Sequence, residues 1–159
     1  MAHVIDTQSG ELLDNLPVDT RPRYAAFTPN GTQLWVSSEM RGSVTVFETA
    51  SRKLLGKIDF APLGDQVQPV GIAFARDGRR AYVALGRGNK VAEVDTVSRH
   101  ILRSFGVGAR AWHLALSPDE RRLFTANGLS GDMSIVDLAT GKARAVQLGG
   151  KPWGVAVSR

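Results

Sequence analysis

The chain has 159 residues, of which 43% are hydrophobic, 7% aromatic and 22% charged, and its formal net charge is +5. This composition is typical of a globular domain and excludes a disordered chain, and no apolar run approaches the ~18 residues that a membrane span requires. The absence of cysteine excludes disulfides, thiolate metal sites and cysteine nucleophiles. The first residues lack the basic and apolar regions of a signal peptide. Either the protein is not exported, or the chain is a mature or truncated piece.

Short runs rich in Val, Ile, Leu, Phe, Tyr and Trp follow one another along the chain, bounded by turn residues and without a sustained helical period. Residues 1–20 hold two such runs. Four more follow at 24–28, 33–38, 43–48 and 53–60, and Asn30-Gly31 favours a hairpin turn between the first two. Similar sets of four occupy 64–107 and 108–150, and a single run at 153–158 ends the chain.

Two motifs recur in these sets. The first begins at Phe27 and returns at Phe74 and Leu116, while the second places an acidic residue at positions 6, 48, 95 and 137. The spacings of 42, 47 and 42 residues, with an insertion near 62–68, are typical of β-propeller blades of four strands, named a to d from the axis outward.

The sequence therefore predicts an all-β propeller of about 3.75 four-stranded antiparallel blades. The expected units are strands c and d in 1–20, complete blades over 21–63, 64–107 and 108–150, and a lone strand a in 151–159.

The b strands Leu34-Trp-Val-Ser, Ala81-Tyr-Val-Ala and Leu123-Phe-Thr-Ala-Asn, each followed by a turn and a strand ending in an acid, resemble the YVTN-type propeller repeat. The stretches 21–29, 68–73 and 151–157 are similar to the C-terminal half of a bacterial propeller subgroup associated with PQQ-dependent alcohol catabolism. The resemblance implies a longer, exported, periplasmic protein that acts beside quinoprotein dehydrogenases. It implies no catalytic residues.

The loops that lead into the a strands carry cations at the expected mouth of the central channel. Arg21 and Arg23 come first, Gln66 and Gln68 occupy the next loop, and Arg110 and Lys151 follow. Such a ring of positive charge would attract a carboxylate-bearing ligand or an acidic partner surface. The favoured alternative is structural, with long cationic side chains covering apolar rims and capping loop carbonyls.

An aromatic residue follows these cations in three of the four loops, and His113 lies beside one of them. His113 is the one candidate for an acid–base group or an axial haem ligand, although a packed histidine is the simpler interpretation. The candidate ligand-binding residues are Arg21, Arg23, Tyr24, Arg110, Trp112, His113, Lys151 and Trp153.

The other sequence features favour structural or recognition roles over catalytic ones. The repeated acids Asp6, Glu48, Asp95 and Asp137 are interpreted as turn caps rather than calcium ligands or general acids. The b–c loops, at 39–42, 86–89 and 128–132, differ more than the strands and favour recognition. No catalytic or metal-binding motif occurs, and no cofactor is predicted. Nucleic-acid binding is not supported, because the arginine pairs lie beside acids without an aromatic platform.

Two functions remain open. The leading hypothesis is a non-enzymatic binding scaffold, accessory to periplasmic PQQ-dependent alcohol oxidation, with a protein or a small anionic ligand as partner. The alternative is an enzyme or cofactor-binding propeller, of the lactonase or haem type, that holds an anionic ligand in the channel.

The sequence is also compatible with more than one assembly of the propeller ring. The exposed edges of an incomplete ring invite pairing. One chain could close into four blades, or the chain could be a fragment of a longer propeller. The favoured alternative is a head-to-tail homodimer of about eight blades.

Overall fold

The computed structural model describes residues 1–158, and these residues are all-β apart from the single 3-10 turn η1 (Ala61–Leu63). The chain starts with a hairpin of β1 (Ala2–Ile5) and β2 (Leu12–Leu16). The first four-stranded sheet consists of β3 (Pro22–Phe27), β4 (Gln33–Ser38), β5 (Ser43–Glu48) and β6 (Leu54–Asp59). The second consists of β7 (Ile72–Phe74), β8 (Arg80–Ala84), β9 (Lys90–Asp95) and β10 (Ile101–Gly106). The third consists of β11 (Ala111–Leu116), β12 (Arg122–Asn127), β13 (Asp132–Asp137) and β14 (Ala143–Gln147).

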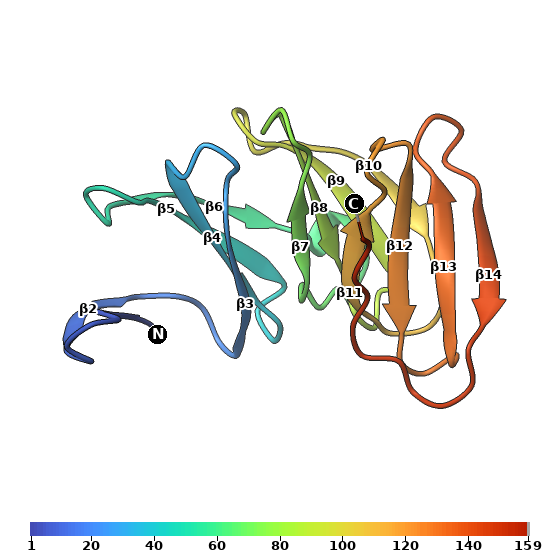
Figure 1. Cartoon of the computed structure of the whole chain (residues 1–159), viewed down its shortest axis with the longest axis horizontal. Helices are drawn as coiled ribbons and strands as arrows, with labels where there is room; N and C mark the ends of the chain where they lie inside the picture. Colours follow the sequence, from blue (N-terminus) through green and yellow to red (C-terminus); the bar gives the residue numbers. More distant parts are fainter. Residues whose placement is uncertain (159) are drawn as a thin grey trace.

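Each sheet is an antiparallel meander whose strands pair in chain order, and the three sheets stand side by side with β3, β7 and β11 as neighbouring inner strands (Figure 1). We call the sheets β3–β6, β7–β10 and β11–β14 blades 1, 2 and 3. The prediction of an all-β chain built from four-stranded antiparallel blades is confirmed. Among residues 1–158, no helix is long and apolar enough to cross a membrane.

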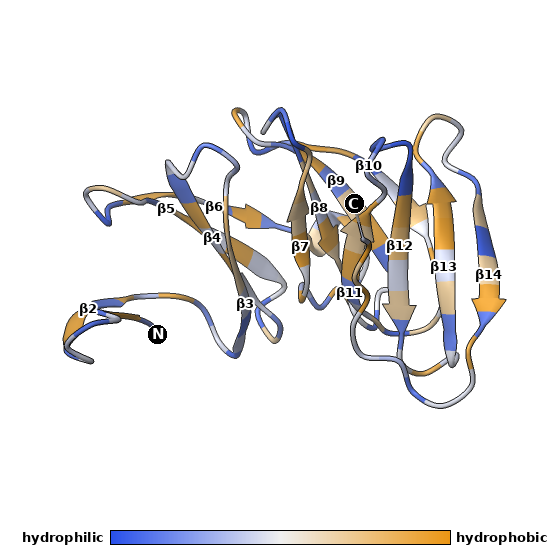
Figure 2. Ribbon diagram, viewed as in Figure 1, coloured by the Kyte–Doolittle hydropathy of each residue, from blue (hydrophilic) through white to orange (hydrophobic). Residues whose placement is uncertain are grey.

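The hydrophobic core lies between the blades rather than inside any one of them. Trp35 and Val46 of blade 1 share a buried cluster with Val94 of blade 2. Tyr82 of blade 2 and Val136 of blade 3 share a second cluster. This stacking follows from strand periodicity, because alternate residues point to opposite faces of a sheet and both faces of a middle blade are covered. Hydrophobic residues accordingly follow the strands while hydrophilic residues gather at the turns (Figure 2).

The N-terminal hairpin completes the stack on the other face of blade 1. Leu16 is buried against Val36 and Phe47, with Val4 packed at the edge of the same cluster. The hairpin therefore occupies the place of the two outer strands of a preceding blade.

The hairpin between β3 and β4 forms as expected, but only one of its two central turn residues, Asn30 and Gly31, has a positive φ. Gly31 has φ +70°, whereas Asn30 keeps a negative φ and uses its side chain instead. Its Oδ1 accepts from the hydroxyl of Thr28 at 2.8 Å and from the backbone N–H of Thr32 at 3.1 Å. The connection thus spans four residues, 29–32, and a hydrogen bond from Thr28 N–H to Gln33 O at 3.0 Å closes it.

The predicted strand at 153–158 is wrong as a strand, because these residues have no ladder partner. Within residues 1–158 no strand pairs with this segment, and its backbone lies beside β11. A hydrogen bond from His113 Nδ1–H to the carbonyl oxygen of Val155 at 3.1 Å joins the segment to β11. The segment follows the path of an inner strand without forming one.

Candidate binding site at the channel mouth

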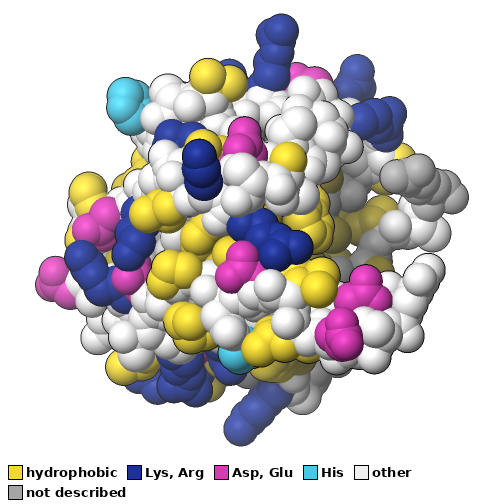
Figure 3. All heavy atoms as spheres, turned by 90° about the vertical axis from the view of Figure 1, so that its left-hand side faces the viewer, with side chains coloured by type: hydrophobic (Ala, Val, Ile, Leu, Met, Phe, Trp, Pro, Cys, Tyr) yellow, Lys and Arg dark blue, Asp and Glu magenta, His cyan; other side chains and the backbone are white. Residues whose placement is uncertain are grey.

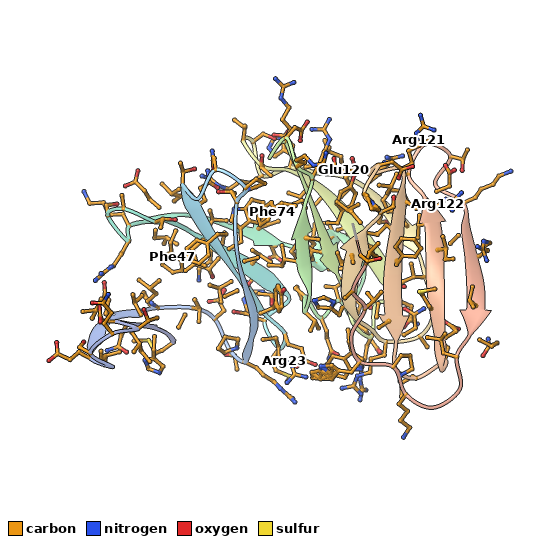
Figure 4. All side chains as sticks on the ribbon, viewed as in Figure 1. Arg23, Phe47, Phe74, Glu120, Arg121 and Arg122 are labelled. Carbon is orange, nitrogen blue, oxygen red and sulfur yellow. The ribbon has the colours of Figure 1, made fainter. Side chains whose placement is uncertain are left out.

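The loops that enter β3, β7 and β11 lie at one end of the blades, together with the b–c loops. Figure 4 shows Arg23 at this end, while Glu120, Arg121 and Arg122 lie at the opposite end. We call the first end the channel mouth, defined by residues 21–24, 39–42, 65–68, 86–89, 109–113, 128–131 and 151–153. It contains every site residue that the sequence singled out.

The two cations of the first loop converge on one carboxylate that sequence reasoning missed. Arg21 Nε and Arg23 Nε lie 3.1 Å and 3.0 Å from Glu39 Oε2. Glu39 is only 2% exposed, and neither contact has hydrogen-bond geometry, so the arrangement is an ion-pair triad. The carboxylate cancels one of the two charges. The positive ring is therefore weaker at blade 1 than the sequence indicates.

An aromatic stack forms the centre of the mouth. Trp112 and Trp153 are parallel within 15°, with ring centroids 4.9 Å apart. The guanidinium of Arg23 lies 5.0 Å from the Trp112 centroid and 5.7 Å from that of Trp153, and Arg110 lies 4.4 Å from Trp112. Cation–π contacts of this kind contribute about 0.5–1 kcal/mol each at exposed sites. They hold two arginines against the rings while leaving Trp153 56% exposed.

The stack depends on a glycine of the b–c loop in blade 3. A Cβ on Gly128 would lie 2.5 Å from Nε1 of Trp112, closer than any real contact allows. Glycine is thus required here by close approach, since Gly128 does not have a positive φ.

His113 is packed on two sides. Its ring meets Tyr24 edge-on, with centroids 5.5 Å apart and planes 72° apart, and its Nδ1 binds the carbonyl of Val155. Tyr24 belongs to blade 1 and His113 to blade 3, so the pair spans the space between two inner strands. The geometry is that of a packing residue that anchors the C-terminal segment.

The other cations of the mouth and the two glutamines of the second loop differ in their surroundings. Lys151 is exposed and forms no ion pair within residues 1–158. Arg21 and Arg110 have φ of 63° and 61°, the left-handed region that costs a non-glycine residue roughly 1 kcal/mol. Gln66 and Gln68 line a shallow hollow of about 170 Å³ with Glu39 and Arg87.

Three of the four repeated acids cap turns by accepting backbone N–H bonds, as the sequence predicts, whereas Glu48 does not. Asp6 Oδ1 accepts from the backbone N–H of Ser9 and Gln8, and Asp95 and Asp137 accept from Ser98 and Thr140 in the same way. These hydrogen bonds lower the pKa of Asp6, Asp95 and Asp137 because they favour the charged carboxylate. Glu48 bonds the hydroxyl of Ser51. Within residues 1–158, no three His, Asp or Glu side chains are placed to hold a metal ion.

The opposite end of the inner strands carries larger but open hollows. One, of about 450 Å³, lies between the a–b turns of blades 1 and 2. Another, of about 430 Å³, lies around Phe74, Leu116 and Val157, where Arg76 N–H donates to Glu120 Oε1 at 2.7 Å. Sequence reasoning missed the Arg76–Glu120 contact, since the two residues lie 44 apart in the chain.

Solved structures with this arrangement are β-propellers. The chain overlays hydrazine synthase of Kuenenia stuttgartiensis with a TM-score of 0.76 and 22% identity, and the overlay covers 94% of this chain and 41% of that one. It overlays the WD40 repeats of RRP9 with a TM-score of 0.75 and 15% identity over 86% of this chain and 41% of the other. The chain is a β-propeller segment. No protein-family model matches it, and no curated protein matches it in sequence.

Identities this low establish the fold alone. The chain spans about two-fifths of each of these solved chains, so their arcs continue beyond the part that this chain overlays.

Proposed function

We propose that the chain is a non-enzymatic propeller scaffold whose channel mouth binds a protein partner. The observation that carries this proposal is the exposed Trp153, stacked on Trp112 and flanked by Arg23 and Arg110. Tryptophan and arginine are the residue types that dominate binding energy at protein interfaces. Met40 and Leu129, at the tips of two b–c loops on the same end, are also exposed.

The shape of the mouth favours a protein over a small molecule. The hollow beside Glu39 measures about 170 Å³, whereas pockets for cofactor-sized ligands span about 300–1,000 Å³. The arginines are also engaged already, with Glu39 or with the tryptophan rings. A rim with this composition and without a larger hollow beside Glu39 suits a broad contact surface.

Charge favours an acidic partner surface. Arg21, Arg87 and Lys151 add to the stacked arginines. The buried Glu39 and the exposed Asp65 oppose them, and the cations remain in excess. Charges at the rim raise the association rate more than they raise the affinity, so binding should weaken as salt rises.

The biological setting proposed is accessory to periplasmic PQQ-dependent alcohol oxidation. Its support is the resemblance of 21–29, 68–73 and 151–157 to the propeller subgroup associated with that pathway. On this proposal the protein is periplasmic, and its partner is an exported quinoprotein dehydrogenase.

The test measures binding of the chain to a purified, immobilised PQQ-dependent alcohol dehydrogenase at 50 mM and 300 mM salt. Trp153→Ala should weaken binding by at least about tenfold, because it removes the exposed face of the stack. Leu54→Ala is the matched control, since Leu54 is 53% exposed but lies on the outer strand β6. Equal affinities of Trp153→Ala and the parent would overturn the assignment of this face, and no binding of the parent would overturn the accessory role.

The same preparation tests for a small ligand. We expect no change in melting temperature with PQQ, haem or sugar lactones, since no described side-chain set is arranged to hold them. A ligand at 100 times its Kd stabilises the folded state by about 2.7 kcal/mol, so a specific ligand would raise the melting temperature by several degrees. Such a rise would contradict the scaffold proposal.

A further inference from the structure

The exposure of the residue before the acid in each c strand shows whether the preceding blade covers that face of the sheet. This position is Ile5 in β1, Phe47 in β5, Val94 in β9 and Val136 in β13. Phe47, Val94 and Val136 are buried, each in the cluster shared with the preceding unit. Ile5 is 55% exposed. The hairpin therefore presents a blade face that no part of residues 1–158 covers.

The exposure of the aromatic residue in the middle of each b strand shows whether the following blade covers the other face of the sheet. Trp35 and Tyr82 are buried against the next blade, whereas their equivalent Phe124 in blade 3 is partly exposed. Ile135, on the same face of blade 3, is partly exposed as well. The segment at 151–158 covers the inner part of this face near β11 but leaves its outer strands open.

The two uncovered faces lie far from one another in the described part of the chain (Figure 1). Figure 1 shows β2 and β14 at opposite sides of the molecule, with all three blades between them. Figure 3 faces the side that carries the hairpin and shows hydrophobic side chains exposed between charged ones. Exposed apolar surface of this kind marks an interaction site in a soluble protein.

Charge distinguishes the two ends. Residues 1–20 contain four acids, Asp6, Glu11, Asp14 and Asp19, and neither lysine nor arginine. Residues 138–158 contain three cations, Lys142, Arg144 and Lys151, and no acid.

Part of the negative charge at the hairpin is already balanced. Asp14 and Asp19 form ion pairs with Arg52 and Lys57 of blade 1, so Asp6 and Glu11 carry the rest. The three cations at the other end form no ion pair within the described residues. The ends thus attract one another between copies and repel their own kind.

We propose that a second copy of this chain covers both faces, with the hairpin of each copy docked on blade 3 of the other. Ile5 of one copy then takes the place against Phe124 that Val94 takes against Trp35 and Val136 takes against Tyr82. Each composite blade consists of the segment 151–158 from one copy and β1–β2 from its partner. The two contacts are equal by twofold symmetry, and they close the ring.

Substitution at Ile5 tests the contact. Ile5→Asp should raise the dimer dissociation constant at least about 100-fold in sedimentation velocity, because it places a charge in an apolar face. Leu54→Asp, at a position of equal exposure that no neighbouring blade covers, should leave it within about twofold. Both variants should keep the far-ultraviolet circular dichroism of the parent, since both side chains are exposed in the single chain. Equal effects of the two substitutions would overturn the proposal.

Cross-linking tests the register, and the chain offers a clean background because it has no cysteine. Ile5→Cys chains mixed with Ile135→Cys chains should give a covalent dimer with a short bis-maleimide. Leu54→Cys mixed with Ile135→Cys should give little. Cross-linking that is no faster for Ile5→Cys than for Leu54→Cys contradicts the docking, and a ladder of products in a double-cysteine chain indicates an open filament instead of a closed ring.

Discussion

Glu39 sets the electrostatics of the channel mouth at the scale of single residues. Its carboxylate is buried between two arginines that the sequence presents as free cations. The pairing joins a d–a loop to a b–c loop, residues 18 and 16 positions apart. Sequence periodicity places both loops at one end of the blades, but it does not say which side chain turns inward. Arginine and glutamate in variable loops are ordinarily solvated, so the triad could not be predicted.

Replacement of Glu39 tests the triad. Glu39→Gln should lower the free energy of unfolding by about 1–3 kcal/mol, because two arginines lose a buried counter-charge. Arg41→Gln is the control, since it removes an exposed pair with Asp59 at 3.8 Å and should cost about 0.5 kcal/mol or less. Urea unfolding followed by circular dichroism measures both, and equal losses would show that Glu39 acts as an ordinary surface charge.

Replacement of Gly128 tests whether close packing holds the tryptophan stack. Gly128→Ala should cost about 1–3 kcal/mol and change the tryptophan fluorescence, because the new methyl group overlaps Trp112. Gly106→Ala is the matched control, with no heavy atom within 4 Å of its Cβ position and no positive φ. It should stay within about 0.5 kcal/mol of the parent. A Gly128→Ala variant as stable as the control would mean that the stack is loose.

At the scale of elements, the strands were largely predictable because alternation, turn residues and the blade repeat agree with one another. The exception is instructive. Residues 153–158 have strand-like composition, yet they form no ladder, because a strand requires a hydrogen-bonded neighbour and none pairs with them among residues 1–158. The tryptophan stack and the His113–Val155 contact hold the segment in place instead. Composition favours a strand at these residues, but a strand forms only where a neighbouring strand supplies the hydrogen bonds.

The turn caps make the elements sensitive to acid. The backbone N–H of Thr140 and then its hydroxyl lower the pKa of Asp137, so its folded-state pKa lies below its unfolded value. Its contribution to stability is therefore complete above the unfolded pKa, about 3.9, and is lost as pH falls below it. Asp137→Asn keeps a capping oxygen without a titrating group. The melting temperature of this variant should fall less steeply than that of the parent between about pH 4 and pH 2.5. Identical slopes in calorimetric scans would contradict the assignment.

At the scale of the whole molecule, the chain is an arc rather than a ring. Blades 1 and 2 are covered on both faces, whereas the hairpin and blade 3 each leave one face open. The sequence predicts the hairpin and the three four-stranded blades that form this arc. It could not predict that Trp153, Arg23 and the Tyr24–His113 pair draw the inner strands of blades 1 and 3 together, because such contacts depend on curvature. The channel mouth is consequently a filled, cationic and aromatic surface instead of an open pore.

The mass of the unmodified chain in solution tests this account most directly. Light scattering coupled to size-exclusion chromatography should give twice the 17.1 kDa of one chain at micromolar concentration and low salt. The dimer should dissociate progressively as the concentration falls or the salt concentration rises. A mass of 17.1 kDa at every concentration would contradict closure of the ring by a second copy.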